Sequence, residues 1–173
     1  MTIWTAPEAH RVPEPQTGAE RPMLQGWLDY HRQTLLLKCA GLTAEQLKTA
    51  SAEPSTLTLL GLVRHMAEVE RWWFRIKATQ DTTVGDLYCP EGNDNGDFDD
   101  VATADAAADF ATFAEEVRLA DEAVAGLPLE HEFPGRRGPI SLRWVYTHMI
   151  EEYARHNGHA DLLRERIDGV TGD

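Results

Sequence analysis

Residues 141–166 carry the pattern of one long helix with a single apolar face. Ser141 is a residue type that caps helix N-termini, and Gly169 lies just past the expected end. Between these ends, apolar residues recur at helical spacing: Leu142, Val145, Met149, Tyr153, Ala160, Leu163 and Ile167. A helix with such a stripe must bury it against other elements, so this segment predicts a helical core.

Two polar residues lie within the apolar arc of this helix. At about 100° per residue, Glu152 and His156 are about 40° apart, and His156 lies close to the centre of the arc. His148 and His159 lie on one flank of it. A carboxylate and an imidazole that point at a core must be paired, hydrogen-bonded or metal-bound, because burying them bare is costly. A core hydrogen bond and a pair of metal ligands are both compatible with these two residues.

Three further long stretches show helical periodicity, over residues 21–41, 58–78 and 104–125. No stretch shows a convincing strand pattern. Four long amphipathic helices in one chain predict an all-α fold, a helical bundle. The connection between the second and third of them, over residues 79–101, is too long for a plain up-down-up-down bundle with short loops throughout.

Local signals place the ends of these helices. Pro22 suits the first turn of the first helix. Thr43 and Gln46 have the spacing of a capping box, which predicts a short helix after them. Thr103 is expected to cap the third long helix. Residues 129–139 are expected to form a loop that leads into the last helix.

The first residues of the chain differ from the rest in composition. Residues 1–20 are expected to form an extended arm, because they contain several residues that favour extended or turn conformations: Pro7, Pro13, Pro15 and Gly18. Residues 21–173 are predicted to form one domain, because a chain of 173 residues can build one substantial core but is too short to expect two.

Charge and composition argue against several classes of partner. The 16 Lys and Arg residues face 29 Asp and Glu residues, and the net charge of −13 disfavours sequence-independent binding to nucleic acid. No apolar run reaches the roughly 18–20 residues of a membrane span, and the N-terminus lacks the pattern of a signal peptide. Cys39 and Cys89 form no CxxC motif. We therefore expect a cytoplasmic, reduced protein without a membrane partner.

The segment 91–100 is rich in Asp, Gly and Asn. It lacks the residue order of a calcium-binding EF-hand loop, so we interpret it as a solvated loop. A long loop beside a helical bundle can also cover a site.

Two histidines on other predicted helices are each compatible with two roles. His65 lies at the edge of the stripe of residues 58–78, one heptad before Trp72, where a side chain can reach between helices. His31 falls on the stripe of the first helix. Taken alone, each is compatible with a structural histidine that makes one hydrogen bond and with a metal ligand.

Two blocks of sequence carry a resemblance to a known family. The first is Leu57-Thr-Leu-Leu-Gly-Leu-Val-Arg-His65-Met-Ala-Glu-Val-Glu-Arg-Trp-Trp-Phe74, and the second runs over residues 141–169 and contains Glu152-Tyr-Ala-Arg-His156-Asn-Gly-His159. Together they resemble the DinB-like superfamily, and in particular its actinobacterial mini-circle protein subgroup. The resemblance implies a four-helix bundle with a divalent metal ion between helices. It also allows a homodimer, with the proline-rich arm as a contact.

The resemblance implies a ligand set. Members of the superfamily have one histidine on the second helix and two ligands four residues apart on the last helix, which correspond here to His65, Glu152 and His156. In many members the last pair is two histidines, so Glu152 is a departure that resembles the mycothiol-dependent maleylpyruvate isomerase branch. His148 and His159 lie close by, and either could replace Glu152 as a ligand or orient one.

The resemblance also implies a chemistry. Two imidazoles and a carboxylate suit Zn²⁺, Ni²⁺ or another first-row divalent ion. In the relatives a small thiol, mycothiol or bacillithiol, binds the metal as a thiolate and attacks a small electrophile, in a transfer or an isomerisation. His31, His148 or His159 could shuttle a proton, and Trp27, Trp72 or Trp144 could line a pocket for the cosubstrate.

Two other functions use the same residues. A metal-activated water would make the protein a hydrolase. A metal that only stabilises the fold would make it a non-catalytic binding or stress-response protein. The sequence contains no HExxH, GxSxG, P-loop or GxGxxG motif that would indicate a different chemistry.

Overall fold

The computed structural model describes residues 3–172, so the first two residues of the predicted arm and the last residue of the predicted domain lie outside the described residues. The elements follow in this order: α1 (Glu20–Cys39), α2 (Ala44–Leu47), α3 (Leu59–Glu70), the π-helix η1 (Arg71–Lys77), α4 (Gly96–Asp99), the 3₁₀ turn η2 (Val101–Thr103), α5 (Ala106–Val124), β1 (Glu132–Gly135), β2 (Gly138–Ser141) and α6 (Leu142–Asp168). The predicted all-α fold is confirmed in that the structure is mostly helical, but it also contains a small two-stranded sheet.

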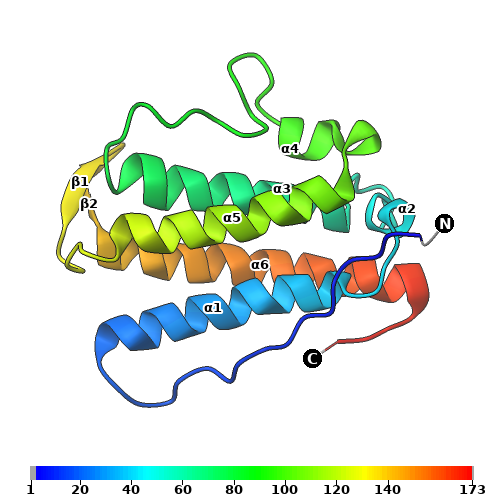
Figure 1. Ribbon diagram of the computed structural model, residues 1–173, viewed down its shortest axis with the longest axis horizontal. Helices are drawn as coiled ribbons and strands as arrows, with labels where there is room; N and C mark the ends of the chain where they lie inside the picture. The colour runs from blue at the N-terminus through cyan, green and yellow to red at the C-terminus, as the bar shows by residue number, and fades with distance from the viewer. Residues whose placement is uncertain (1–2, 173) are drawn as a thin grey trace.

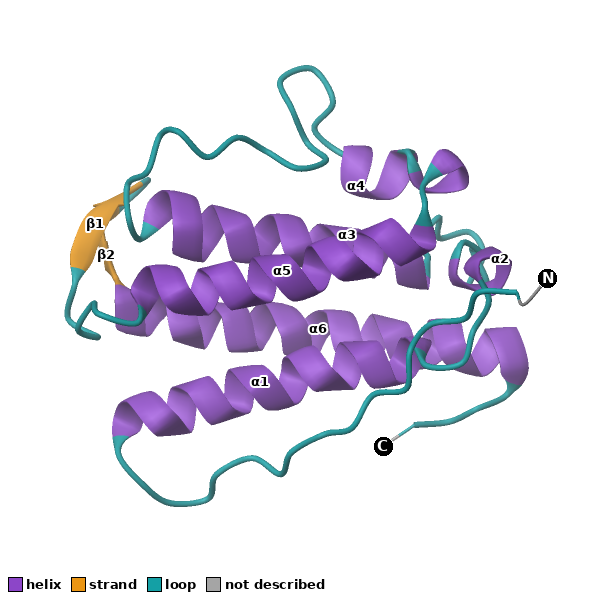
Figure 2. Cartoon of the chain, in the orientation of Figure 1, coloured by secondary structure: helices purple, strands orange, loops and turns teal. Residues whose placement is uncertain are grey.

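Four long helices, α1, α3, α5 and α6, lie side by side (Figure 1). Helix α6 packs against α1 and α3, while α5 packs against α3 and η1. The two strands lie at one end of these helices and α2 lies at the other (Figure 2). This arrangement places the inner faces of α3 and α6 against each other, near the middle of the molecule.

The apolar stripe of α6 is buried as predicted. Five of its residues are 0% exposed: Leu142, Val145, Met149, Tyr153 and Ala160. The Ser141 side chain accepts the backbone N–H of Trp144 at 3.2 Å, and Gly169 ends the helix with a φ of 80°. Gly169 adopts this left-handed conformation without the steric cost that a Cβ atom would bring. Both predicted ends of the last helix are therefore confirmed.

The other predicted caps have different outcomes. The capping box is confirmed, because the Thr43 hydroxyl accepts the Gln46 N–H at 3.3 Å and the Gln46 side chain accepts the Thr43 N–H at 3.0 Å. The prediction that Thr103 caps the third long helix is wrong. Thr103 lies in η2, and the Asp105 carboxylate instead accepts the N–H of Ala108 at 3.2 Å. Asp is at least as good an N-cap as Thr.

The predicted helix over residues 58–78 is regular only in its first half. Thr58 caps α3, which runs to Glu70, and the chain then continues as a π-helix over Arg71–Lys77. A π-helix has a wider turn than an α-helix, and such segments are frequent at functional sites. The change of period turns the side chains after Glu70 to directions that a 3.6-residue pattern does not predict.

The expectation of a loop over residues 129–139 without strands is wrong. β1 and β2 pair as an antiparallel hairpin, with Phe133 opposite Ile140 and Gly135 opposite Gly138. Phe133 is buried, which anchors the hairpin on the helices. These strands are hard to recognise in the sequence because each contains a proline, Pro134 or Pro139, and proline is uncommon within strands.

The interpretation of residues 91–100 as a solvated loop is wrong at Gly96 and Asp97, which are both buried. Arg64 of α3 donates to the backbone carbonyls of these two residues at 3.0 Å. Nearer the start of the connection, Glu68 accepts the backbone N–H of Tyr88 at 2.6 Å. The long connection is therefore fastened to the outer side of α3 by two charged residues of that helix.

A buried ion pair joins the helices on the side of α1. The Arg32 guanidinium donates to both carboxylate oxygens of Glu70, at 2.7 and 2.8 Å. The Tyr153 hydroxyl donates to the same carboxylate at 2.8 Å, and Arg32 also reaches Asp121 at 3.0 Å. The Glu70 side chain is 0% exposed. One carboxylate thus ties together residues of α1, α3 and α6.

The N-terminal segment packs onto the connection after α1. Ala6 is buried, its N–H donates to the Leu42 carbonyl at 2.8 Å, and its carbonyl accepts the N–H of Gly41 at 3.0 Å. The segment then runs beside α1 (Figure 1). The division of the chain into an arm and a domain stays a prediction.

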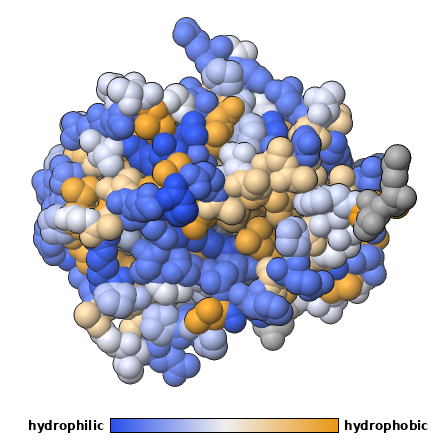
Figure 3. All heavy atoms as spheres, in the orientation of Figure 1, coloured by the Kyte–Doolittle hydropathy of each residue, from blue (hydrophilic) through white to orange (hydrophobic). Residues whose placement is uncertain are grey.

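Much of the face in Figure 3 is hydrophilic, with apolar residues gathered in smaller patches. Within residues 3–172, no helix is both long enough and apolar enough to cross a bilayer.

Candidate metal centre

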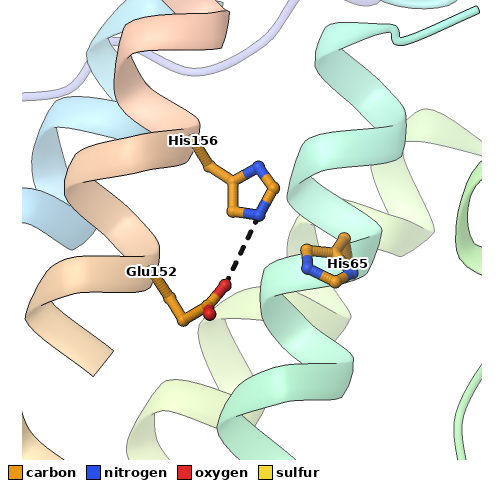
Figure 4. Close-up of side chains that lie close together, drawn as sticks. All are labelled: His65, Glu152 and His156. Atoms are coloured by element: carbon orange, nitrogen blue, oxygen red, sulfur yellow. Dashed lines mark ion pairs between the residues drawn. The ribbon is translucent and has the colours of Figure 1, made fainter. Parts of the chain in front are cut away.

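The structure brings His65 of α3 together with Glu152 and His156 of α6 (Figure 4). One potential ligand atom from each residue lies within 4.8 Å of those of the other two. Glu152 and His156 are one helical turn apart, and the His65 and His156 ring centroids are 4.8 Å apart. The three side chains are 13% to 23% exposed. They form a half-buried group that we call the α3–α6 cluster.

The donor set of the α3–α6 cluster fits a divalent first-row ion. Zinc binds imidazole nitrogens and carboxylate oxygens at about 2.0–2.2 Å, so ligand atoms around one ion lie roughly 3–4 Å apart. The Glu152 Oε2 and His156 Nε2 atoms are 3.6 Å apart, which matches this spacing. Three protein ligands would leave coordination positions open for water or substrate.

A carboxylate from the long connection orients His65. The Nδ1 of His65 lies 2.7 Å from Oδ2 of Asp97, a buried carboxylate. Because an ionised carboxylate can only accept a hydrogen bond, Nδ1 donates to it, and Nε2 is left as the ring atom with a free lone pair. Phe98 stacks on the His65 ring at 5.0 Å. Metal-binding histidines usually have such an orienting carboxylate behind them.

Sequence reasoning missed Asp97. It lies 32 residues after His65, in the segment that composition indicated to be solvated. The length of the connection was a signal that it covers a site. It did not single out Asp97, because the connection contains several Asp residues that the sequence pattern does not distinguish.

Replacing Asp97 with alanine should lower the affinity for Zn²⁺ by about 10- to 100-fold, because His65 would lose the partner that fixes its tautomer and ring orientation. Competition with a chelator of known affinity measures this change. Asp99→Ala is the matched control, because Asp99 is an exposed carboxylate of the same short helix. Equal affinities for the two variants would contradict the orienting role of Asp97.

His156 is held in its neutral form. Burial of the imidazole is the main cause that lowers its pKa to about 4, and the nearby His65 and His159 rings act in the same direction. Its Nδ1 is 3.3 Å from the Nδ1 of His159. Metal binding requires a neutral imidazole, so this environment favours the ligating form at neutral pH.

The depressed pKa of His156 predicts a pH dependence of stability for the metal-free protein. The unfolded chain takes up a proton near the ordinary value of 6.5, while the folded chain does so only near 4. The folded state is therefore progressively destabilised as the pH falls from 6.5 to 4. We expect a lower denaturant midpoint at pH 5 than at pH 7 for the metal-free protein, and a smaller difference for His156→Gln. An equal difference in both proteins would assign this pH dependence to other groups.

His148 lies beside the α3–α6 cluster. Its Nε2 is 3.6 Å from Oε1 of Glu152, and its ring stacks on Trp144 at 4.7 Å and packs edge-on against Trp73 at 4.9 Å. His148, Glu151 and Glu152 also form a second group of potential ligands, but all three come from α6 and Glu151 is exposed. His159 contacts His156, as described above. Both flanking histidines thus lie next to the predicted ligands.

The structure places His31 and Trp27 elsewhere. His31 of α1 packs against Trp27 at 6.0 Å and Tyr30 at 5.7 Å, and its Nδ1 lies 3.4 Å from the Asn157 side-chain nitrogen. Burial lowers the pKa of His31. Neither potential metal-binding group among residues 3–172 includes His31. Trp72, in contrast, lines a cavity at the hairpin end of the helices, together with Trp144.

The chain was compared with known protein families, curated proteins and solved structures. The family model described as Mycothiol-S-transferase matches residues 23–169. This range includes all three residues of the α3–α6 cluster. No curated protein and no solved structure matches the chain.

Proposed function

This chain belongs to the mycothiol-S-transferase family, which is DinB-like, and on that premise we propose that it is a metal-dependent transferase that joins a small thiol to an electrophile. We propose that α1, α3 with η1, α5 and α6 form the four-helix bundle of the superfamily. The α3–α6 cluster would hold the metal ion, with Zn²⁺ or Ni²⁺ as the proposed ion and mycothiol as the proposed thiol.

One observation supports a metal site over a simple core hydrogen bond. Nε2 of His156 and Oε2 of Glu152 are 3.6 Å apart, which is longer than a hydrogen bond of about 2.7–3.2 Å. The two side chains point toward each other from successive turns of α6 (Figure 4). Half-buried polar groups without a direct bond favour a bridging ion or water.

A divalent ion in this position would lower the pKa of a bound thiol and favour the thiolate, which is the nucleophilic form. We propose His148 as the proton acceptor, because it lies next to Glu152 and contacts Trp73 and Trp144, two of the residues that line the cavity at the hairpin. It would take the proton when the thiol binds, so that the sulfur attacks carbon as a thiolate. The carbon–leaving-group bond would break with its electron pair on the leaving group, which departs as an anion.

The proposal is tested by titrating Co²⁺-substituted protein with mycothiol and with 2-mercaptoethanol, while recording the sulfur-to-cobalt charge-transfer band. We expect the band at micromolar mycothiol and not at the same concentration of 2-mercaptoethanol. Incubation of the Zn²⁺ protein with mycothiol and 1-chloro-2,4-dinitrobenzene should then release chloride. The absence of a band with either thiol would overturn the proposal and favour hydrolysis or a non-catalytic metal site. A cytoplasmic location, a homodimer and the lack of a nucleic-acid partner stay predictions.

A further inference from the structure

A cavity of about 860 Å³ lies between the π-helix η1, the hairpin and the first turn of α6. We call it the hairpin cavity. Its volume lies within the range of about 300–1,000 Å³ that is common for small-molecule sites. Residues of η1, of both strands of the hairpin and their turn, and of α6 line it, among them Trp72 and Lys77 of η1, Arg136 and Arg137 of the turn, and Trp144 of α6. The hairpin appears in yellow and orange at one end of the helices in Figure 1.

The cations of the hairpin cavity have no carboxylate partner. Within residues 3–172, Lys77, Arg136 and Arg137 are the Lys and Arg side chains that neither donate a hydrogen bond nor form an ion pair. All three line this one cavity. In a chain with 29 acidic residues and a net charge of −13, unpaired cations gathered at one place indicate an anionic ligand. Glu132, an exposed residue, is the one acidic residue of the lining.

The aromatic residues of the hairpin cavity offer flat apolar surface. Trp72 is 39% exposed and Trp144 is 45% exposed, and the Lys77 ammonium lies 4.4 Å from the centre of the Trp72 ring. Trp73 packs edge-on against Trp144 at 5.3 Å. Because η1 is a π-helix, Trp72, Trp73 and Lys77 all line the same cavity although they are close neighbours in sequence. Exposed indole rings with a cation over the face of one of them suit a planar ring that carries an acid group.

The inner wall of the hairpin cavity adjoins the α3–α6 cluster. Trp73 and Trp144, which both line the cavity, also contact the His148 ring, and His148 in turn lies 3.6 Å from Glu152. A ligand held on these tryptophans is thus one side chain away from a proposed metal ligand.

We propose that the hairpin cavity binds a small planar organic anion, an aromatic ring that carries a carboxylate or sulfonate group. The ring would lie against Trp72 and Trp144, and the acid group would face Lys77, Arg136 and Arg137. The further statement that this anion is the electrophile rests on the proposed function, whereas the binding itself does not.

Binding is tested on the metal-free protein by calorimetry, with 2-naphthoate as the probe and 2-naphthylmethanol as its neutral counterpart. We expect 2-naphthoate to bind at least about tenfold more tightly. The double substitution Arg136→Gln and Arg137→Gln should raise the Kd for 2-naphthoate about tenfold and leave that of the alcohol unchanged. Arg118→Gln is the matched control, because Arg118 is an exposed arginine of α5 that pairs with Glu115 and Glu122 outside the cavity.

Equal affinity for the acid and the alcohol would overturn the proposal, as would an unchanged Kd in the double variant. Both arginines lie in the turn of the hairpin and are exposed, so the variant should unfold at the same temperature as the parent protein. Glu132→Gln should tighten binding of 2-naphthoate, since it removes the one acidic residue of the lining.

A second comparison asks whether the anion is the electrophile. In the presence of Zn²⁺ and mycothiol, 4-chloro-3,5-dinitrobenzoate should react with a lower KM than 1-chloro-2,4-dinitrobenzene, and the double variant should raise only the KM of the acid, about tenfold. In both reactions the sulfur–carbon bond forms, the thiol loses its proton and chloride leaves. Tight binding of 2-naphthoate without a charge-transfer band would support the cavity and overturn the transferase. A charge-transfer band together with equal KM values for the two chlorides would support the transferase and overturn the statement that the anion is the electrophile.

Discussion

Replacing His156 with alanine should lower the affinity for Zn²⁺ by more than about a hundredfold, beyond the 10- to 100-fold cost of losing an orienting partner. The imidazole is one of three donors in the α3–α6 cluster, and Glu152 and His65 alone would leave the ion with two protein ligands. The measurement is metal content after dialysis against a buffered concentration of free Zn²⁺. The parent protein should retain one ion per chain, and the variant close to none.

His10→Ala is the control for this experiment, because His10 is exposed and lies in the N-terminal segment. Glu152→Ala and His148→Ala decide which of the two neighbouring residues binds the ion. Loss of the ion in Glu152→Ala alone supports the proposed ligand set, whereas loss in His148→Ala alone assigns the third position to His148. Full stoichiometry in His156→Ala would show that the α3–α6 cluster is not the metal site.

Replacing Glu70 with alanine should lower the free energy of unfolding by about 3–5 kcal/mol, because it leaves the Arg32 guanidinium buried without its main partner. Arg32 is 3% exposed and Glu70 is 0% exposed, so the guanidinium would lie in a region with little access to bulk water. The same change removes the acceptor of the Tyr153 hydroxyl. Chemical denaturation followed by circular dichroism gives this value.

The double variant Arg32→Met and Glu70→Leu tests the cause. If the loss of stability comes from a buried Arg32 guanidinium without its carboxylate partner, replacing both residues with apolar ones should recover most of the free energy of unfolding. Glu122→Ala serves as the comparison on the surface. It removes one exposed partner of Arg118 and should change the stability by no more than about 1 kcal/mol. A loss below about 1 kcal/mol for Glu70→Ala would mean that the buried pair contributes as little as the exposed one.

The long helices could be predicted because their apolar residues repeat at helical spacing over many turns. In α6 the pattern, the Ser141 cap and the Gly169 terminator agree, and local signals that agree define an element well. The ligand set of the α3–α6 cluster was instead an implication of the family resemblance, because periodicity alone left both a core hydrogen bond and a metal site open. His156 lies near the centre of a buried arc, and His65 lies on an edge that faces the neighbouring helix.

The features that escaped prediction depend on contacts between distant residues or on backbone geometry. The pair of Arg32 and Glu70 is separated by 38 residues, and no local pattern marks either one as buried. The π-helix η1 follows α3 without a break in composition, so its wider turn is visible only in the structure. The hairpin is stabilised by the burial of Phe133 on the helices, which outweighs the unfavourable effect of its prolines.

His31 shows the limit of reasoning from a single helix face. It lies on the stripe of the first helix as predicted, but that stripe covers both the contact with α3 and the contact with α6. The position of His31 beside Asn157 follows from how α1 crosses α6, which the sequence of either helix alone does not determine.

The hydrogen bonds between the long connection and α3 couple metal binding at His65 to the packing of that connection on the helix. Asp97 belongs to the connection and holds His65, while Arg64, on the same helix as His65, holds the backbone of Gly96 and Asp97. An ion that favours the oriented form of His65 must therefore favour the closed form of the connection, and by thermodynamic reciprocity the closed form must favour the ion. Amide hydrogens of residues 87–98 should exchange with deuterium more slowly in Zn²⁺-loaded protein than in metal-free protein.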